Sequence, residues 1–452
     1  MMKKARNKFR KGAASFYVVA FSTLILIIIA TSFAAIIISE ATRTMNDDLA
    51  QSAYDSALAG IEDAKIAFYN YQSCKEQGVS AVRPNGVSPL SCAEIVWYME
   101  NPDCDMVAHI LGRIGELESG EASGGVLIQE TTKGDNMMQQ AYTCVKINTK
   151  LSDYRSSLSE ENPTRAVRVK LANTVANNIK KVKISWYSSA DGSDLAFTNT
   201  NASATKVQFP TLRSAKAATP PTIAVGLVQT TNTFNLSDFD KVKNGATNRG
   251  TVFLVPTDSS TMASKSLADN YIGTYVNGEN VLTSAQVSKS NDRSVKNLPY
   301  VVYCPRDLTS EFACSLTMDL PDAIGGARSD ETFMLVMSIP YGQPNTDFAM
   351  EFFCGNNSSC GAMTIDGSPV ASGQAVLEGV QVNIDSTGRA NSFYRRVEAR
   401  LDSADTYFPY PLYAVELLDN TLGKNLLEKN MTVTTEYSKN EYPANLNSLL
   451  AE

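Results

Sequence analysis

The clearest pattern along the chain is one long segment, from Ala13 to about Asn70, that changes from wholly apolar to amphipathic. The first proline after it is Pro84 and the one glycine within it is Gly60, so nothing forces a helix to end here. At about 1.5 Å per residue, such a helix would be roughly 85 to 90 Å long. We therefore expect a single helix to organise the N-terminal part of the chain.

The first half of this segment, residues 13–39, has the length and composition of a membrane helix. It is an uncharged run of about 27 residues, and roughly 20 suffice to span the hydrocarbon core of a bilayer. Only basic charges precede it, whereas Glu40, Asp47 and Asp48 follow. The positive-inside bias then predicts a cytoplasmic leader of a dozen residues and an exported remainder.

The second half, residues 40–72, is amphipathic, with small apolar residues recurring at steps of three and four and acidic residues between them. Small residues let another backbone approach closely, and the sequence leaves open whether this is a sheet of the same chain or a neighbouring helix. We predict a role in helix assembly for Leu49, Ala53, Ala57, Gly60 and Ala64; Ala67 and Tyr71 continue the same stripe.

These features carry a resemblance to a known family. The basic leader ending in RKG, followed at once by the apolar helix, resembles the class III signal segment of the type IV pilin superfamily. Residues 53–64, AYDSALAGIEDA, are similar to the alanine-rich A-G-I-E continuation of the PilX-like group of minor pilins. The resemblance covers about the first 70 residues. It implies that prepilin peptidase cuts between Gly12 and Ala13, and that the mature helix joins a helical bundle in a filament.

One position departs from the pattern of the family. Major pilins carry a glutamate at the fifth mature position, which here is Tyr17. In the family, that glutamate is thought to neutralise the amino terminus of an adjacent subunit in an apolar bundle. The large minor pseudopilin that caps the type II secretion pseudopilus also lacks it. Tyr17 therefore favours a tip or initiating position over a repeated shaft position.

Two other interpretations of the N-terminal segment remain. A plain signal anchor with an exported ectodomain has the same hydropathy and differs only in lacking the processing site. A cleaved secretory signal is disfavoured, because the apolar run exceeds the roughly 7 to 15 residues typical of such a region.

Length and charge narrow the class of protein further. A chain of 452 residues predicts about three structural units on the length prior. The formal net charge is -7 even with the basic leader included. A nucleic-acid-binding protein is expected to show a basic face, so we predict no nucleic-acid partner.

The cysteine count is even, and all eight cysteines lie beyond the apolar segment. Disulfides in an oxidising compartment explain this better than zinc, since no C-x-x-C occurs and His109 is the one histidine. We expect Cys304 to pair with Cys314 and Cys354 with Cys360. The four before residue 150 allow three pairings, and the sequence does not choose among them; they are Cys74, Cys92, Cys104 and Cys144.

Beyond the long helix, the chain divides into three further segments. Residues 73–163 form a mixed, helical, cysteine-containing region, with helices predicted over residues 88–100 and 105–117. Residues 164–220 hold strands followed by a Ser/Thr/Ala-rich linker. Residues 221–452 form a β-rich domain of short strands.

Turn residues predict two hairpins in the β-rich part. Asn277-Gly278 lies between extended runs, and both positions of such a turn need positive φ. A later pair joins residues 374–384 to residues 390–401, with the turn predicted at Asp385 to Gly388. The fold class is therefore α+β: a long N-terminal membrane helix followed by a mainly antiparallel, disulfide-stapled extracellular head.

Catalytic and metal-binding patterns are weak throughout. Asp258-Ser259-Ser260 follows an apolar strand and begins like a metal-ion-dependent adhesion site, but Met262 replaces its last serine and we predict no α/β alternation here. His109 has no second histidine or nucleophile motif to work with, which favours a structural role. We predict no enzyme activity, no metal and no cofactor.

The sequence favours a structural function. We expect a minor pilin-like subunit of a type IV pilus or related filament, which primes assembly or sits at the tip. Its partners would be other pilin subunits, prepilin peptidase and the membrane. It would cross the inner or cytoplasmic membrane once and then become part of an extracellular filament or the cell surface. The alternative is an adhesin or binding ectodomain for a surface ligand on a plain signal anchor.

Overall fold

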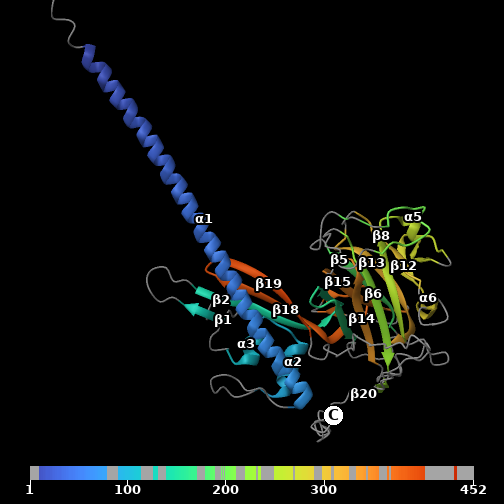
Figure 1. Cartoon of the computed structure of the whole chain (residues 1–452). Helices are drawn as coiled ribbons and strands as arrows, with labels where there is room; N and C mark the ends of the chain where they lie inside the picture. The colour runs from blue at the N-terminus through green and yellow to red at the C-terminus, as the bar shows by residue number, and fades with distance from the viewer. Residues whose placement is uncertain are drawn as a thin grey trace, which may run out of the picture. The chain divides into compact units, whose positions relative to one another are not determined.

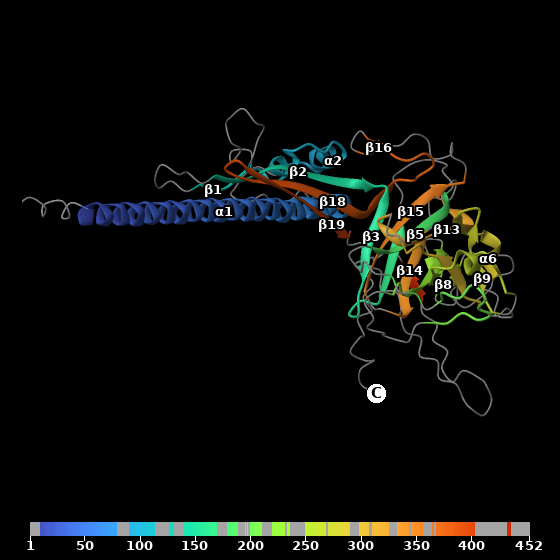
Figure 2. The same cartoon turned by 90° about the horizontal axis from the view of Figure 1, so that it is seen from above.

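The fold comes from a computed structural model of the chain (Figures 1 and 2). It describes residues 10–78, 90–113, 126–130, 139–169, 179–188, 195, 197, 199–209, 219–230, 233–235, 249–267, 270–289, 298–306, 310–324, 332–342, 345–355, 364–365, 368–402 and 432–434. The chain forms two compact units: unit 1 is Met1–Ile147 with Ile384–Ala399, and unit 2 is Asn148–Asn383 with Arg400–Glu452.

Unit 1 is built on helix α1, Arg10–Gln77, which is 68 residues long. At about 1.5 Å per residue the helix is roughly 100 Å in length. The single helix predicted from residue 13 to about residue 70 is thus confirmed, and it extends further at both ends. Its second half lies along a four-stranded sheet in both views, with strand order β1-β2-β18-β19 (Figures 1 and 2). These strands are Val126–Glu130, Gln139–Leu151, Leu377–Ala390 and Phe393–Asp402.

Two short helices follow α1. Helix α2, Cys92–Glu100, begins with a capping box in which the Ser91 and Glu94 side chains accept hydrogen bonds from each other's backbone N–H. Helix α3, Met106–Leu111, ends at Gly112, whose φ of 76° is the left-handed conformation typical of a helix end. The prediction of a helix that ends at Glu100 is confirmed, but α2 begins at Cys92, later than predicted, because Ser91 caps it. Helix α3 is shorter than predicted because Gly112 ends it.

Two disulfides hold this part together. Cys74 of α1 is bonded to Cys92 of α2, and Cys104, just before α3, is bonded to Cys144 of β2. The sequence allowed three pairings of these four cysteines, and the structure has this one. Closing such a loop lowers the conformational entropy of the unfolded chain. In the chain-entropy account, each disulfide thereby stabilises the folded state by about 3 kcal/mol.

Unit 2 contains two six-stranded sheets around one core. The first has the order β10-β11-β13-β5-β15-β3 and the second β4-β14-β6-β8-β12-β9. In the first sheet the strands are Tyr275–Val276, Glu279–Leu282, Phe312–Ile324, Ile179–Ser188, Thr346–Cys354 and Asp153–Leu158. In the second they are Thr164–Val169, Thr332–Tyr341, Thr222–Thr230, Arg249–Thr257, Tyr300–Tyr303 and Ile272–Gly273.

The remaining elements of unit 2 are short. Helices α5 and α6 follow β8 and β11 and span Ser260–Ala263 and Ser284–Lys289. Two further strand pairs are β16 with β17 and β20 with β7. Their bounds are Thr364–Ile365, Ser368–Pro369, Thr432–Thr434 and Thr233–Asn235.

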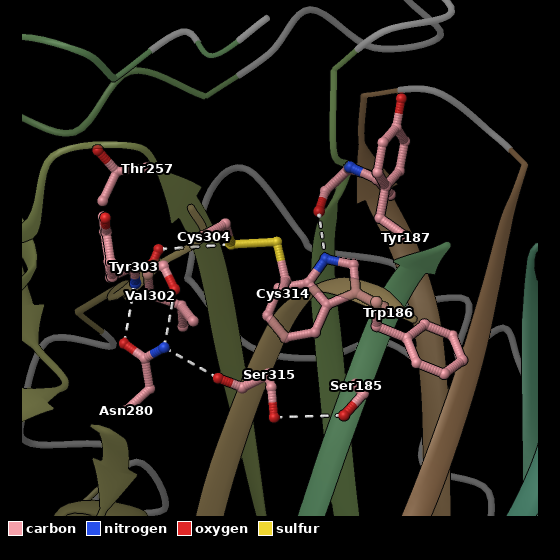
Figure 3. The surroundings of a disulfide bond; sticks show 12 residues. Ser185, Trp186, Tyr187, Thr257, Asn280, Val302, Tyr303, Cys304, Cys314 and Ser315 are labelled. Atoms are coloured by element: carbon pink, nitrogen blue, oxygen red, sulfur yellow. Dashed lines mark hydrogen bonds between the residues drawn. A yellow bond between two sulfur atoms is a disulfide. The ribbon is translucent and has the colours of Figure 1, made fainter. Parts of the chain in front are cut away.

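Alternating apolar positions from both sheets fill the core of unit 2. Ile184, Trp186 and Phe348 come from the first sheet, and Val225 and Leu254 from the second. The Trp186 indole, fully buried, donates to the carbonyl of Pro221 at 3.2 Å (Figure 3). A sheet with one buried face produces the period of two along these strands.

The Cys304–Cys314 disulfide fastens the end of β12 to β13 and thereby links the two sheets (Figure 3). This pairing agrees with the prediction. Beside it, the Asn280 amide donates to the carbonyls of Tyr303 and Ser315 and accepts from the Tyr303 N–H. Cys354 is also disulfide-bonded, whereas Cys360, its predicted partner, lies outside the described residues.

The compact units do not follow the segments predicted from the sequence. Residues 73–163 were expected to be a mixed region with two helices, and they contain β1, β2 and β3, which were not predicted, as well as the two short helices. Residues 221–452 were expected to form one domain, but residues 384–399 belong to unit 1. The mainly antiparallel α+β class is confirmed, with some parallel pairs: β12 is parallel to both β8 and β9, and β11 is parallel to β13.

Candidate functional site

The N-terminal half of α1 exposes large apolar side chains on every side. From Phe16 to Ile38 no residue is buried, and Phe16, Phe21 and Ile38 are each about two thirds exposed or more. The most apolar stretch has a mean hydropathy of 2.6 over 18 residues, so this helix is long and apolar enough to cross a membrane. A single-pass membrane anchor is consistent with this helix.

The C-terminal half of α1 packs against the sheet of unit 1. Ala53, Ala57, Ala64 and Ala67 have no exposed surface, and Gly60 is also buried. A Cβ on Gly60 would lie 2.8 Å from the Cγ2 of Val145 in β2. The small residues are therefore required by a close approach of helix and sheet.

The tightest point of this approach is Gly388 of β18. A Cβ placed there would overlap the Ala53 carbonyl oxygen and the Ala57 N–H nitrogen, and would lie 2.9 Å from the Ala57 Cα. Because these are backbone atoms of α1, they cannot move aside as a flexible side chain does. Only glycine fits at this position.

Polar contacts fix how α1 lies on the sheet. The Ser386 hydroxyl of β18 donates to the Ala57 carbonyl at 2.7 Å, and the Gln140 amide of β2 donates to the Ser52 hydroxyl at 2.5 Å. Tyr142 of β2 donates through its hydroxyl to Asp63 at 2.8 Å. Partnered polar groups in a buried interface select one register, since any sliding would leave them without partners.

Asp63 is the charged residue at the centre of this interface. Its side chain is only 9% exposed, and its carboxylate also contacts the Arg113 guanidinium at 2.9 Å. A buried carboxylate is tolerated when it is paired and hydrogen-bonded, as Asp63 is.

The predicted site residues thus separate into two groups. Leu49 is half-buried, whereas Ala53, Ala57, Gly60 and Ala64 are buried within their own chain, with the sheet directly against the first three. This decides between the two covers left open by the sequence, and corrects the assembly role of those four residues to internal packing. They are not exposed to a neighbouring helix.

The residues predicted for processing and for the tip position lie in the exposed half. Gly12 and Ala13 fall within α1, which begins at Arg10, so the helix is continuous through the predicted junction. Tyr17 is 64% exposed. These three residues keep their predicted roles as predictions.

The other candidate residues lie in structural settings. His109 stacks on Tyr98, with ring centroids 5.2 Å apart, between α2 and α3. Asp258 contacts Arg306, with 2.7 Å between its carboxylate and the Arg306 Nε. We predicted no α/β alternation around Asp258. This prediction is wrong in part, because α5 follows β8 and β8 is parallel to β12. Among the described residues, no group of three or more His, Cys, Asp and Glu side chains could hold a metal ion.

Comparison with known proteins adds no family. No protein-family model matches the chain, and no curated protein is significantly similar to it.

Sequence reasoning missed the sheet side of the helix interface. Gly388 and Ser386 were interpreted as turn residues, and Asp63 as one of the polar positions between the apolar ones. A usable signal existed for Asp63, since it directly precedes Ala64 of the small stripe. No local signal in the sequence links residues 386–388 to residues 53–57.

Proposed function

We propose that this chain is a minor pilin-like structural subunit of a type IV pilus or related filament. The observation that carries the proposal is the division of α1 into an exposed apolar half and a half built into the head. A filament bundle and a membrane both require such an apolar helix. Because α1 continues into its second half without a flexible joint, the position of the apolar half in the membrane or the bundle determines that of the sheet packed on the second half.

Within the filament, the proposal favours a tip or priming position. Tyr17 replaces the glutamate found at the fifth mature position of major pilins, so this subunit offers no carboxylate to the amino terminus of a neighbour. A subunit at the tip or at the start of assembly has neighbours on one side only, so it does not need to offer this contact. The same role is non-catalytic and needs no cofactor.

The proposed life of the subunit has two stages. It is first anchored once in the inner or cytoplasmic membrane, with prepilin peptidase removing residues 1–12. It then joins other pilin subunits through the exposed half of α1 and becomes part of an extracellular filament or the cell surface. The three disulfides between described cysteines support an oxidising compartment for the head.

Deletion of the chain from its host, with filaments counted by electron microscopy, tests this role. A priming subunit predicts that filaments disappear and that the full-length chain restores them. Normal filaments combined with lost surface attachment would favour the alternative, an adhesin on a plain signal anchor. A matched strain that carries the Tyr17→Glu variant should still assemble filaments, with the subunit found along the shaft as well as at the tip.

A further inference from the structure

Unit 2 has an open cleft of about 490 Å³ whose lining is mostly charged or polar. Ligand pockets generally have volumes of about 300 to 1,000 Å³, so the cleft has the size of a small-molecule site. Its walls come from β3, β4, β5, β13, β15, β18 and β19, so both large sheets contribute.

Small residues lie beside Arg155 in the first sheet. Across the first sheet, Arg155 of β3 lies opposite Ala349 of β15, and Ala349 lies opposite Ser185 of β5. Tyr154 and Leu158 point into the core, so Arg155 and Ser157 are on the opposite face of β3. The Arg155 side chain can therefore extend over the sheet toward Glu311, which it contacts beside β13.

Arg155 is held in place along its whole length. Its Nε donates to Asp153 at 2.5 Å and its Nη1 to Glu311. Burial opposes the charge of Arg155, but the hydrogen bonds to Asp153 and Glu311 outweigh this and raise its pKa. Gln381 of β18, which is buried, brackets the Arg155 backbone by accepting from its N–H at 3.3 Å and donating to its carbonyl at 2.7 Å.

The other two arginines are fixed in the same way. Both Nη atoms of Arg400 lie 3.0 Å from the Asp153 Oδ1, and the Arg165 Nη2 lies 3.2 Å from the Asp402 Oδ2. Each guanidinium keeps donors for a ligand, because the side chains of Arg155, Arg165 and Arg400 remain 38%, 30% and 29% exposed. The cleft is thus preorganised but not closed.

The backbone is strained at one wall of the cleft. Tyr187 has a φ of 66°, a conformation that is rare for a bulky residue, and its N–H donates to the Thr346 hydroxyl at 3.1 Å. The next residue, Ser188, donates to Asp347 at 3.0 Å. Ser188 and Asp347 both line the cleft. Strain of this kind persists where the surrounding structure over-determines it, and it is concentrated at ligand sites.

The cleft has no surplus of positive charge, and this limits the class of ligand. Three arginines face three carboxylates, Glu311, Asp347 and Asp402, and Asp153 adds a further negative charge beneath them. A site for phosphate, sulfate or an acidic sugar needs surplus positive charge, which is missing here. A ligand for this cleft should be neutral and should both donate and accept hydrogen bonds.

We propose that the cleft binds a neutral saccharide. Sugar hydroxyls both donate and accept, so they can use guanidinium donors together with the carboxylate and serine acceptors next to them. Hydrogen bonds to charged partners are the stronger kind, which suits a ligand without charge of its own. Phe312, which is half-buried, supplies an apolar surface for the C–H face of a sugar ring.

The test uses the full chain in phospholipid nanodiscs, because detergents with sugar headgroups would compete for the cleft. Ligand-observed NMR and calorimetry measure binding of the methyl glycosides of glucose, galactose, mannose and N-acetylglucosamine. Inorganic sulfate and N-acetylneuraminic acid serve as anionic probes. We expect at least one neutral glycoside to bind, with a Kd on the order of 1 mM, and neither anion to bind more tightly.

Two variants locate the binding. Ser157 is an exposed cleft residue, and Ser157→Trp should fill the cleft and weaken binding roughly tenfold or more. The matched control is Thr251→Trp, at an exposed strand position of unit 2 outside the cleft lining, which should leave the Kd unchanged. If Ser157→Trp does not fold, Glu311→Gln, at a side chain that is 55% exposed, should weaken the same glycoside several-fold.

The proposal fails if none of the four neutral glycosides binds, or if only sulfate or N-acetylneuraminic acid does. It also fails if a glycoside binds the cleft variants as tightly as it binds the unchanged protein, because the ligand then lies elsewhere. These outcomes are independent of the filament proposal, since the cleft is formed wholly by residues of unit 2.

Discussion

The two halves of α1 share one continuous backbone but have opposite surfaces. Between Phe16 and Ile38 the helix carries large apolar side chains, and none of them is covered by the chain. Between Ala53 and Tyr71 one face is buried within the chain: it carries mainly alanine and glycine, with Ile61, Phe68 and Tyr71 among them, and the sheet approaches it most closely at Ala53, Ala57 and Gly60. The first half offers apolar area that only lipid or other subunits can cover, while the second half has already been covered by its own head.

The comparison teaches that residue size, as well as hydrophobicity, separates the two roles. Burial of large side chains is driven by the apolar area removed from water, at about 25 cal/mol per Å². Burial of small ones allows close approach of backbones, so that hydrogen bonds such as Ser386 to the Ala57 carbonyl can form. A helix with both surfaces can be anchored at one end and be part of a folded head at the other.

The largest expected effect is at Gly388. Gly388→Val would place a side chain against backbone atoms of α1, so helix and sheet must separate, at a cost of about 4 kcal/mol or more. Denaturant unfolding of the full chain should show this loss. The matched control is Gly226→Ala, whose Cβ would meet nothing closer than 3.5 Å and should change the free energy of unfolding by less than about 1 kcal/mol.

A slightly smaller effect is expected at Asp63. Asp63→Ala removes the acceptor of both Tyr142 and Arg113 inside the interface, and should cost about 3 kcal/mol in the free energy of unfolding. Asp55→Ala is the control on the exposed side of the same helix, where the aspartate accepts from Gln51, and should cost less than about 0.5 kcal/mol. Equal losses in the two variants would contradict the buried role of Asp63.

Two isoleucines of similar exposure test the difference between the halves. Ile28 and Ile66 are 55% and 51% exposed, but only Ile28 lies in the apolar half. Ile28→Arg should disfavour membrane insertion by about 3 kcal/mol without destabilising the head, while Ile66→Arg should change neither by more than about 0.5 kcal/mol. Membrane flotation and thermal unfolding measure the two effects. Loss of membrane association in both variants would remove the distinction.

The smallest effect is expected for Tyr142→Phe. It removes one hydroxyl that donates to Asp63 and should cost about 1 kcal/mol. In the Asp63→Ala background the same substitution should cost clearly less, and this difference measures the coupling of helix and sheet. Strictly additive losses in this double-mutant cycle would show that the contact does not contribute.

Local pattern was sufficient to predict α1 and most strands of unit 2. The helix needs only the absence of proline and a regular stripe. Alternation and β-branched residues predict strands that begin at residues 164, 178, 222 and 251, and β4, β5, β6 and β8 each begin within two residues of these positions. The Asn277-Gly278 turn between β10 and β11 is confirmed, with φ values of 53° and 94°. In each case, neighbouring residues in the sequence determine the structure.

The second predicted hairpin shows where local pattern misleads. The turn was predicted at Asp385 to Gly388, but β18 continues to Ala390 and the turn lies at Asn391 and Ser392, with Asn391 at a φ of 51°. Gly388 is required by α1, which is more than 300 residues earlier in the chain, as the separation of 329 between Ser386 and Ala57 shows. A glycine that is required by a tertiary contact cannot be distinguished, from local sequence alone, from a glycine that forms a turn.

The cleft of unit 2 was not predictable for a related reason. Arg155, Glu311 and Arg400 belong to strands far apart in the sequence, and only strand order brings them together. The pairing of Cys104 with Cys144 depends likewise on the position of β2, a strand that was not predicted. Chain topology, which sequence pattern alone does not specify, determines both.

The mature amino terminus is the measurement that tests the account most directly. Mass spectrometry of the protein from membrane and sheared-filament fractions should find a start at Ala13, with the N-terminal amine methylated, in both fractions. That result would establish processing between Gly12 and Ala13 and the presence of the subunit in filaments. An intact leader beginning at Met1 or Met2, found in membranes alone, would contradict the filament subunit and leave a plain signal-anchored ectodomain.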